Sequence, residues 1–373
     1  MSDTKPIRHG EELNEANLQE FLHANFPEAK GEIEISQFPA GSSNLTYCVR
    51  IGDEEYVLRR PPFGNLVKSA HDMKREFDVL SKLSKVYKPA PKPLIYCADE
   101  AVIGSEFYLM ERRRGLIIRG KSPTSEPLAV AGGALLSVPP AVAGGLTLEN
   151  SPTLRKKICE SFIENLVDLH ALDYKNIGLE NLGKPEGYAR RQVEGWTKRF
   201  FNAKIDEHLE LENAIEWLNA HIPTSIGASL VHNDYKFDNI MLDPGDLTEI
   251  VAVLDWEMTT VGEPLMDLGT TLGYWMSKEA GEEMLSMPFN PRVLMENISR
   301  RELVEMYAER SGRDVSDMLF YYVFGTFKIA VIAQQIYFRF ARGFTQDKRF
   351  ATFDRFVNAL GEIALHAIKT KEI

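Results

Sequence analysis

Apolar residues recur with helical spacing in two long parts of the chain. Near the N-terminus this spacing predicts a helix over residues 13–26, whose apolar positions are Leu13, Leu18, Phe21, Leu22 and Phe26. A second helix is predicted to begin at Ser151-Pro152, because serine caps helices well and proline suits the first helical turn. Its apolar face comprises Leu154, Ile158, Phe162, Leu166 and Leu169, and ends at His170, which we expect to be a satisfied core residue.

Short β-like runs lie between these two helical parts. An extended segment opens at Ile33, and further runs occupy Tyr47–Ile51, Tyr56–Arg59 and Phe107–Glu111. A helix-like run over His71–Leu83 interrupts them. The N-terminal part is therefore predicted to mix strands and helices, whereas the chain turns helical from Ser151.

The most apolar helical stretch runs from Met318 to Phe340. It is long enough to raise the question of a membrane span, but polar residues interrupt it at Lys328, Gln334, Gln335 and Arg339. We interpret it as a buried helix of the C-terminal part and expect no membrane partner.

Residues 127–147 have an unusual composition. Ala129-Val-Ala-Gly-Gly133 recurs as Ala141-Val-Ala-Gly-Gly145, and no charged residue stands between Glu126 and Glu149. The segment is predicted to be a mobile or poorly packed insertion.

Charge and cysteine content exclude several function classes. The 373 residues carry a net charge of −11 and have no basic block, which disfavours nucleic acid as a partner. The three cysteines form neither a disulfide framework nor a zinc motif, as expected for a reducing compartment. Because the N-terminus is polar and lacks the apolar core of a signal peptide, we expect a cytoplasmic protein.

Candidate chemistry is concentrated in one loop and the strand after it. His232, Asp234 and Asn239 lie close together between apolar flanks, and Asp255 ends a β-like run sixteen residues after Asn239. This spacing is typical of a phosphotransferase site. Lone His-x-Asp patterns and Asp-Asn turns are usually structural, but their joint occurrence at this spacing is rare.

Phosphoryl transfer depends on positioning and charge neutralisation, which assigns a role to each residue. Asp234 would accept or orient the hydroxyl of the acceptor. Asn239 and Asp255 would supply the oxygen ligands that Mg²⁺ prefers. Lys236 is placed to reach the transferred phosphoryl group, and His232 is expected to support the loop by hydrogen bonding.

One further motif resembles a phosphate-binding loop but is not expected to form one. Gly115–Ser122 matches the P-loop pattern formally, but Pro123 and Pro127 oppose the helix that a P-loop opens, and Leu116 to Ile118 are bulky for a phosphate nest.

The chain resembles the aminoglycoside phosphotransferase (choline-kinase-like) family of the protein-kinase-like fold. More narrowly, it resembles the kinase-like domain associated with acyl-CoA dehydrogenases. The loop that carries His232, Asp234 and Asn239, here termed the catalytic loop, is one segment that carries this resemblance. The others are Phe38–Tyr47, Tyr56–Pro62, Asp168–Asp173, Arg191–Trp196, Leu254–Glu257 and Gly262–Leu268.

The resemblance implies a two-lobed α+β fold. A small N-terminal lobe over residues 1–110 would have an antiparallel sheet and a helix, and a larger, mainly helical lobe over 111–373 would carry the catalytic loop. ATP and Mg²⁺ would bind in the cleft between them. The residues implied in nucleotide binding are Gly41, Ser42, Ser43, Asn44, Arg59, Glu76, Met110 and Glu111.

Several of these residues have specific implied roles. Arg59 stands where kinases present a lysine to the phosphates, and keeps the positive charge. Glu76 would be its ion-pair partner, and the backbone near Met110 and Glu111 would meet the adenine edge. Asp267 would brace the catalytic loop through backbone N–H groups.

The loop specifies a hydroxyl on a small-molecule acceptor. The narrower resemblance favours a hydroxyacyl-CoA or related metabolite, for which the basic residues Arg112, Arg113, Arg114, Arg190 and Arg191 would be candidates. An aminoglycoside acceptor is the alternative, although no acidic run is concentrated near the C-terminus. A nucleotide-binding pseudokinase that scaffolds a partner and a metal-dependent hydrolase remain as rival classes. Trp196 is either one wall of the acceptor pocket or a packing residue.

Overall fold

The chain forms two compact units. The computed structural model describes residues 4–27, 30–38, 44–63, 72–119, 148, 151–276, 285 and 291–373. The first unit holds the described residues up to Ile118 together with Asn239–Glu257, and the second holds Arg119, Leu148–Asp238 and Met258–Ile373. The lobe boundary near residue 110 stays a prediction, because these compact units run across it. The alanine- and glycine-rich segment 127–147 lies outside the described residues.

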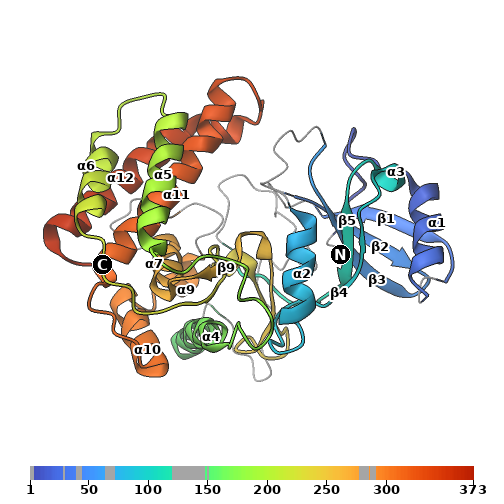
Figure 1. The fold of residues 1–373 in the computed structure, drawn as a ribbon, viewed down its shortest axis with the longest axis horizontal. Coiled ribbons are helices and arrows are strands. Elements are labelled where there is room, and N and C mark those ends of the chain that lie inside the picture. The colour runs from blue at the N-terminus through green and yellow to red at the C-terminus, as the bar shows by residue number, and fades with distance from the viewer. Residues whose placement is uncertain are drawn as a thin grey trace. The chain divides into compact units, whose positions relative to one another are not determined.

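A five-stranded antiparallel sheet in the order β1-β2-β3-β5-β4 forms the centre of the first unit. Its strands are β1 (Ile33–Gln37), β2 (Leu45–Ile51), β3 (Glu54–Arg60), β4 (Pro93–Cys97) and β5 (Phe107–Glu111). The helices are α1 (Glu15–Asn25), α2 (Met73–Leu83) and α3 (Glu100–Ile103). Figure 1 shows α1 and α2 on opposite sides of the sheet.

Helices α1 and α2 begin later in the sequence than their apolar patterns predict. The side chain of Asn14 accepts a hydrogen bond from the N–H of Asn17, and Asp72 accepts one from the N–H of Arg75. Because an N-cap residue satisfies N–H groups that have no partner within the helix, these two residues set the starts of α1 and α2.

Alternation along the sheet separates a hydrophobic face from a polar one. Leu58 is buried in the hydrophobic core that includes Leu18 and Leu22 of α1. The next residue, Arg59, points to the opposite face because successive side chains of a strand alternate. Tyr108 of β5 pairs with Arg59 across the ladder and therefore lies on that same face. The sheet thus presents an arginine on the face that α2 covers.

A later hairpin completes the first unit. Strands β7 (Ile240–Leu242) and β8 (Ile250–Val253) pair with each other. The backbones of Leu116 and Leu242 exchange hydrogen bonds of 2.8 Å, and the N–H of Val253 donates to Pro89 O at 2.8 Å. The hairpin is flanked by the short helices η1 (Phe237–Asn239) and η2 (Trp256–Met258).

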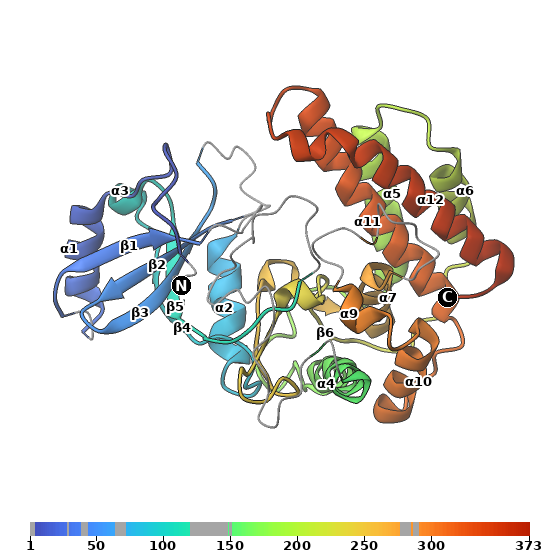
Figure 2. The ribbon, with the colours of Figure 1, turned by 180° about the vertical axis from the view of Figure 1, so that it is seen from behind.

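The second unit is mainly helical, as expected (Figure 2). Its helices are α4 (Pro152–Ala171), α5 (Tyr188–Ala203), α6 (Leu209–Ala220), α7 (Pro264–Tyr274), α9 (Arg292–Met295), α10 (Arg300–Ser311), α11 (Met318–Ala341), η4 (Lys348–Thr352) and α12 (Phe353–Thr370). Strands β6 (Ser229–Val231) and β9 (Thr260–Gly262) form a two-stranded ladder. The side chain of Ser151 accepts from the N–H of Leu154, so the predicted start of α4 is confirmed.

Two glycines allow α7 and α11 to cross at close range. A Cβ atom at Gly325 would lie 2.0 Å from Gly269 O, and one at Gly269 would lie 2.1 Å from Tyr321 O. No side chain fits between the helices at this point. The crossing fixes the position of Asp267 on α7 and of Lys328 on α11.

Helix α11 confirms the buried helix predicted over Met318–Phe340. Among the described residues it alone is long and apolar enough to span a membrane by length and composition, and most of its apolar window is buried inside the protein. Such burial is typical of a core helix.

Candidate active site

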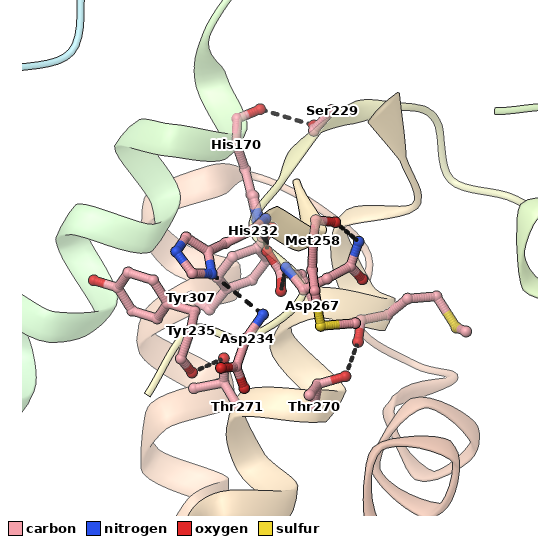
Figure 3. Close-up of polar contacts among 12 residues, drawn as sticks. His170, Ser229, His232, Asp234, Tyr235, Met258, Asp267, Thr270, Thr271 and Tyr307 are labelled. Carbon is pink, nitrogen blue, oxygen red and sulfur yellow. Dashed lines mark hydrogen bonds and ion pairs between the residues drawn. The ribbon is translucent and has the colours of Figure 1, made fainter. Parts of the chain in front are cut away.

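One buried carboxylate holds the backbone of the catalytic loop in the second unit. Asp267, which is fully buried, accepts hydrogen bonds from the N–H groups of His232 (2.6 Å) and Asn233 (2.8 Å). Figure 3 shows Asp267 close to His232 and Asp234. The predicted bracing role of Asp267 is confirmed.

A buried histidine holds the Asp267 carboxylate in turn. His170 Nε2 lies 3.2 Å from Asp267 Oδ2, and its Nδ1 lies 2.8 Å from Tyr307 Oη. Burial opposes ionisation, but the hydrogen bonds and charges of His170 and His232 outweigh it and hold the pKa of Asp267 below its ordinary value. His170 is thus the satisfied core residue that its sequence position indicates.

His232 supports the loop from behind, as predicted. Its Nδ1 accepts a hydrogen bond of 3.2 Å from the backbone N–H of Asp234, which Figure 3 shows as a dashed line. Asn233, between them, has φ of 67°, a left-handed conformation that asparagine tolerates better than most residues. The loop therefore turns sharply just before the proposed base.

Two polar side chains contact the Asp234 carboxylate. Lys236 Nζ lies 2.9 and 2.7 Å from its two oxygens, and Tyr274 donates a hydrogen bond of 3.1 Å to Oδ1. Burial disfavours the ammonium, but the charge of Asp234 outweighs it and raises the pKa of Lys236 above its usual range. Lys236 is therefore a cation that lies against Asp234.

Tyr274 was not expected from the sequence. Burial, together with the charge of Asp234, raises the pKa of this tyrosine, so that it stays a hydrogen-bond donor. It is the last residue of α7, where a tyrosine in an apolar helix looks like an ordinary packing residue. No spacing rule could have assigned it to the site.

Asp238 is a further buried carboxylate of the loop. Burial raises its pKa, while Arg119 opposes this shift from 3.4 Å. Arg119 belongs to the P-loop-like segment, so a structural ion pair accounts for this arginine. Gly115 of the same segment packs too closely against Met241 to admit a Cβ atom, and residues 120–122 lie outside the described part of the chain.

Arg59, the cationic residue that the sequence predicts to contact phosphate, lies in the first unit. Arg59 Nη1 lies 3.1 Å from Glu76 Oε1, so the predicted ion pair is present, and Arg59 Nη2 lies 3.0 Å from Asp255 Oδ1. Burial disfavours the guanidinium, but Glu76, Tyr108 and Asp255 outweigh it and raise the pKa of Arg59. Burial also raises the pKa of Glu76, against the attraction of Arg59.

The β7–β8 hairpin brings the two proposed metal ligands together. Ile240 pairs with Val253, and the N–H of Leu254 donates to Asn239 O at 2.8 Å. Asn239 directly precedes β7 and Asp255 follows β8 after one residue, so both stand at the same end of the hairpin. One amide oxygen and one carboxylate fit a Mg²⁺ ion that completes its coordination with phosphates and water.

The end of the small-residue loop is tied to the segment after Asp255. Asn44 Nδ2 donates to Glu257 Oε2 at 2.7 Å, and Arg75 Nη1 donates to Glu257 O at 2.9 Å. Glu257 was not proposed from the sequence. Of the predicted phosphate loop, Gly41, Ser42 and Ser43 lie outside the described residues.

Met110 and Glu111 stand at the end of β5. The N–H of Glu111 donates to Lys92 O at 2.9 Å, and its carboxylate accepts from the N–H of Lys92 at 2.7 Å. The Glu111 N–H is therefore engaged, and the adenine contact of this segment stays a prediction.

Two cavities in the described parts differ in what they can hold. A cavity of about 40 Å³ in the first unit is lined by Arg59, Glu76, Tyr108 and Asp255, among others. It has room for a few water molecules. A cavity of about 970 Å³ in the second unit is lined by parts of α9, α10 and α12 and by Trp275 and Met276, which follow Tyr274. The volume of the larger one lies in the range of small-molecule sites.

Most of the arginines proposed to bind an anionic acceptor form ion pairs or hydrogen bonds within the protein. Arg112 and Arg114 both form ion pairs with Glu55, and Arg113 Nη2 lies 2.7 Å from Glu111 Oε1. Arg191 donates to the backbone carbonyls of residues 184 and 186. Arg190 is exposed. Trp196 is buried and its indole N–H donates to Gln192 Oε1 at 3.2 Å, as for a packing residue.

The fold and the match to a family model define a kinase-like phosphotransferase. The sequence profile of the "Phosphotransferase enzyme family" matches residues 34–138 and 123–287, and the chain belongs to this family. A protein from Ralstonia eutropha solved as a candidate aminoglycoside phosphotransferase is 26% identical, with a TM-score of 0.76 over 96% of this chain and 99% of that one. An aminoglycoside phosphotransferase solved in ternary complex with ADP and hygromycin B shares the fold, with 13% identity and a TM-score of 0.56 over 94% of this chain and 98% of that one.

Curated relatives are longer proteins. Human "Acyl-CoA dehydrogenase family member 11" is 33% identical over 360 residues, which cover 95% of this chain but 42% of that protein. The chain thus spans less than half the length of the curated relatives it matches. The narrower resemblance noted from the sequence is confirmed.

Proposed function

We propose that this phosphotransferase moves the γ-phosphate of Mg·ATP to a hydroxyl group of a small molecule. The observation that carries the proposal is the held Asp234 carboxylate. His232 Nδ1 accepts from its backbone N–H, Asp267 holds the N–H groups of the two preceding residues, and Tyr274 donates to one of its carboxylate oxygens. A carboxylate held in this way can accept or orient the proton of an attacking hydroxyl.

Residues of the first unit would hold the nucleotide. Asn239 and Asp255 would bind Mg²⁺, which when bound neutralises charge on the phosphates. Arg59 would grip a phosphate with the guanidinium that now contacts Asp255. Lys236, which lies against Asp234, would contribute a second cation. The neighbour solved with ADP supports nucleotide use.

For the acceptor we propose a hydroxyacyl-CoA or a related metabolite. The names of the relatives, which are acyl-CoA dehydrogenase family members, support this choice. Of the candidate arginines, Arg114 and Arg190 are exposed to an anionic ligand, which would compete with Glu55 for Arg114. Arg112 is a poorer candidate, because its side chain is only 6% exposed.

The test is ADP release from Mg·ATP with a panel of hydroxyacyl-CoAs, aminoglycosides, sugars and amino alcohols. We expect acceptor-stimulated release that falls at least a hundredfold in Asp234→Asn. Asp243→Asn is the matched control, because Asp243 only caps a turn through its side-chain oxygen and should keep full activity.

The other outcomes separate the alternatives. Stimulation by aminoglycosides alone would replace the acyl-CoA proposal. ATP binding without turnover on any acceptor would favour a pseudokinase scaffold. If Arg114→Ala with Arg190→Ala left the KM for a hydroxyacyl-CoA unchanged, these arginines would have no part in binding it.

A further inference from the structure

A buried lysine lies beneath the catalytic loop and has no role in the proposed reaction so far. Lys328 belongs to α11, whose neighbouring residues are almost all apolar, and is 2% exposed. Its Nζ donates a hydrogen bond of 2.6 Å to Asn233 O, and lies 5.7 Å from the centre of the Trp196 ring. A lysine is seldom buried without a specific partner, because its charge loses hydration.

The partner of Lys328 is the residue in left-handed conformation directly before Asp234. Every polar group of Asn233 is bonded within the second unit. Its N–H donates to Asp267, its side-chain oxygen accepts from Tyr188 (3.2 Å), and its side-chain nitrogen donates to Met258 O (3.1 Å). The carbonyl oxygen is the group left for Lys328.

This contact clamps one peptide group at both ends. The peptide between residues 233 and 234 comprises the carbonyl of Asn233 and the N–H of Asp234. Lys328 holds the carbonyl, and His232 Nδ1 accepts the N–H at 3.2 Å, a contact that Figure 3 shows. The orientation of this peptide sets the direction of the Cα–Cβ bond of Asp234. A charged donor holds a carbonyl more strongly than a neutral one.

We propose that Lys328 is a positioning residue: by holding the Asn233 carbonyl it locks the peptide before Asp234 and so aims the Asp234 carboxylate at the acceptor hydroxyl. The consequence for turnover rests on the proposed function, whereas the peptide clamp itself does not. A small misplacement of a reacting group is enough to slow catalysis about a hundredfold.

The proposal predicts a pH dependence that a packing residue would not cause. Burial lowers the pKa of Lys328 to about 8, against the attraction of Asp234 and Asp267 and with the repulsion of Lys236 and Arg199. As the pH rises through this value, Lys328 loses its proton and its hold on the carbonyl weakens. We expect kcat to fall there in the wild type, and this fall to be absent in Lys328→Met.

Hydrogen exchange tests the clamp without any assay of activity. In Lys328→Met, which keeps the length of the side chain, the amide of Asp234 should exchange at least tenfold faster than in the wild type. The buried amide of Leu166 in α4 reports global opening and should not change. Gln334→Met is the matched control, because Gln334 is also buried on α11 but donates to Ala203 O (2.9 Å), away from the loop.

Turnover is then measured on the same three proteins. We expect kcat of Lys328→Met to fall ten- to a hundredfold while the KM for Mg·ATP stays within threefold, and Gln334→Met to keep its kcat. Unchanged exchange at Asp234 would overturn the inference whatever the activity. Faster exchange with an unchanged kcat would overturn the positioning role. If the wild type itself transfers no phosphate, the proposed function fails, and the exchange result still decides the clamp.

Discussion

At the scale of single residues, Asp267 shows how the protein keeps a charge in its interior. The carboxylate is fully buried, yet two backbone N–H groups and His170 surround it. A buried charge with this many hydrogen bonds is tolerated, whereas its removal leaves several donors without an acceptor.

Asp267→Asn should therefore lower the free energy of unfolding by on the order of 3 kcal/mol at pH 7. The pKa of Asp267 is lowered in the folded protein, so its contribution is present above the unfolded pKa of about 4 and is lost as the pH falls through the folded value. Urea unfolding at neutral and acidic pH would measure the difference between the two proteins. The difference should shrink in acid.

Asp314→Asn is the control for this change. The pKa of Asp314 is also lowered, mainly by hydrogen bonds from Ser316, but the side chain is exposed and asparagine can replace its turn-capping oxygen. A loss of stability in this variant as large as in Asp267→Asn would contradict the explanation.

Which site residues the sequence could predict depends on how each is marked there. Asp234, Asn239 and Asp255 stand at a spacing that few other structures require, and Arg59 with Glu76 follows from the resemblance. Tyr274 and Lys328 are polar residues in mainly apolar helices, where sequence indicates only an interrupted hydrophobic face. Their partners lie 40 and 95 residues away, and only the packing of α7 and α11 brings them to the loop.

At the scale of elements, the crossing of α7 and α11 controls the geometry of the loop. Asp267 and Lys328 approach the loop from these two helices, and the glycines at the crossing set the distance between the helix axes. The apolar pattern predicted α11 as a buried helix. It could not predict the crossing, because close approach depends on which glycine meets which backbone.

Gly325→Ala should force the two helices apart. The added methyl group would lie 2.0 Å from Gly269 O, and overpacking of this kind destabilises by roughly 1–3 kcal/mol or more. We expect a lower Tm and, because Asp267 and Lys328 shift, a lower kcat. Calorimetry and the ADP-release assay would measure both.

Gly195→Ala in α5 should stabilise the protein, in contrast to Gly325→Ala. A Cβ atom there meets its nearest neighbour, Arg199 Nη1, at an ordinary distance of 3.7 Å. Alanine favours a helix interior over glycine by about 1 kcal/mol, so the Tm should rise. A fall in Tm for both variants would mean that helix crossing is not the cause.

At the scale of the whole molecule, the proposed roles are divided between the two units. Arg59, Asn239 and Asp255 belong to the first unit, and Asp234 and Lys236 belong to the second. This division predicts that a substitution can abolish phosphate transfer without abolishing nucleotide binding.

Asp234→Asn should still gain thermal stability from Mg·ATP although it transfers no phosphate. Asp255→Asn should lose both the stabilisation by Mg·ATP and phosphate transfer, since it removes a proposed metal ligand and one partner of Arg59. Thermal unfolding with and without Mg·ATP, repeated with EDTA, would measure this. An Mg·ATP-dependent rise in Tm for Asp255→Asn equal to that of the wild type would refute the assignment of the metal site.

The hairpin β7–β8 has a consequence for synthesis on the ribosome. The first unit includes Asn239–Glu257, yet more than a hundred residues of the chain separate Ile118 from this hairpin. A nascent chain that has just emerged as far as Ile118 lacks the backbone that pairs with Leu116 and Pro89. At 5–20 residues per second the missing strands follow on the order of ten seconds later. During this delay the first unit is incomplete, and a chaperone that binds nascent chains can act on it.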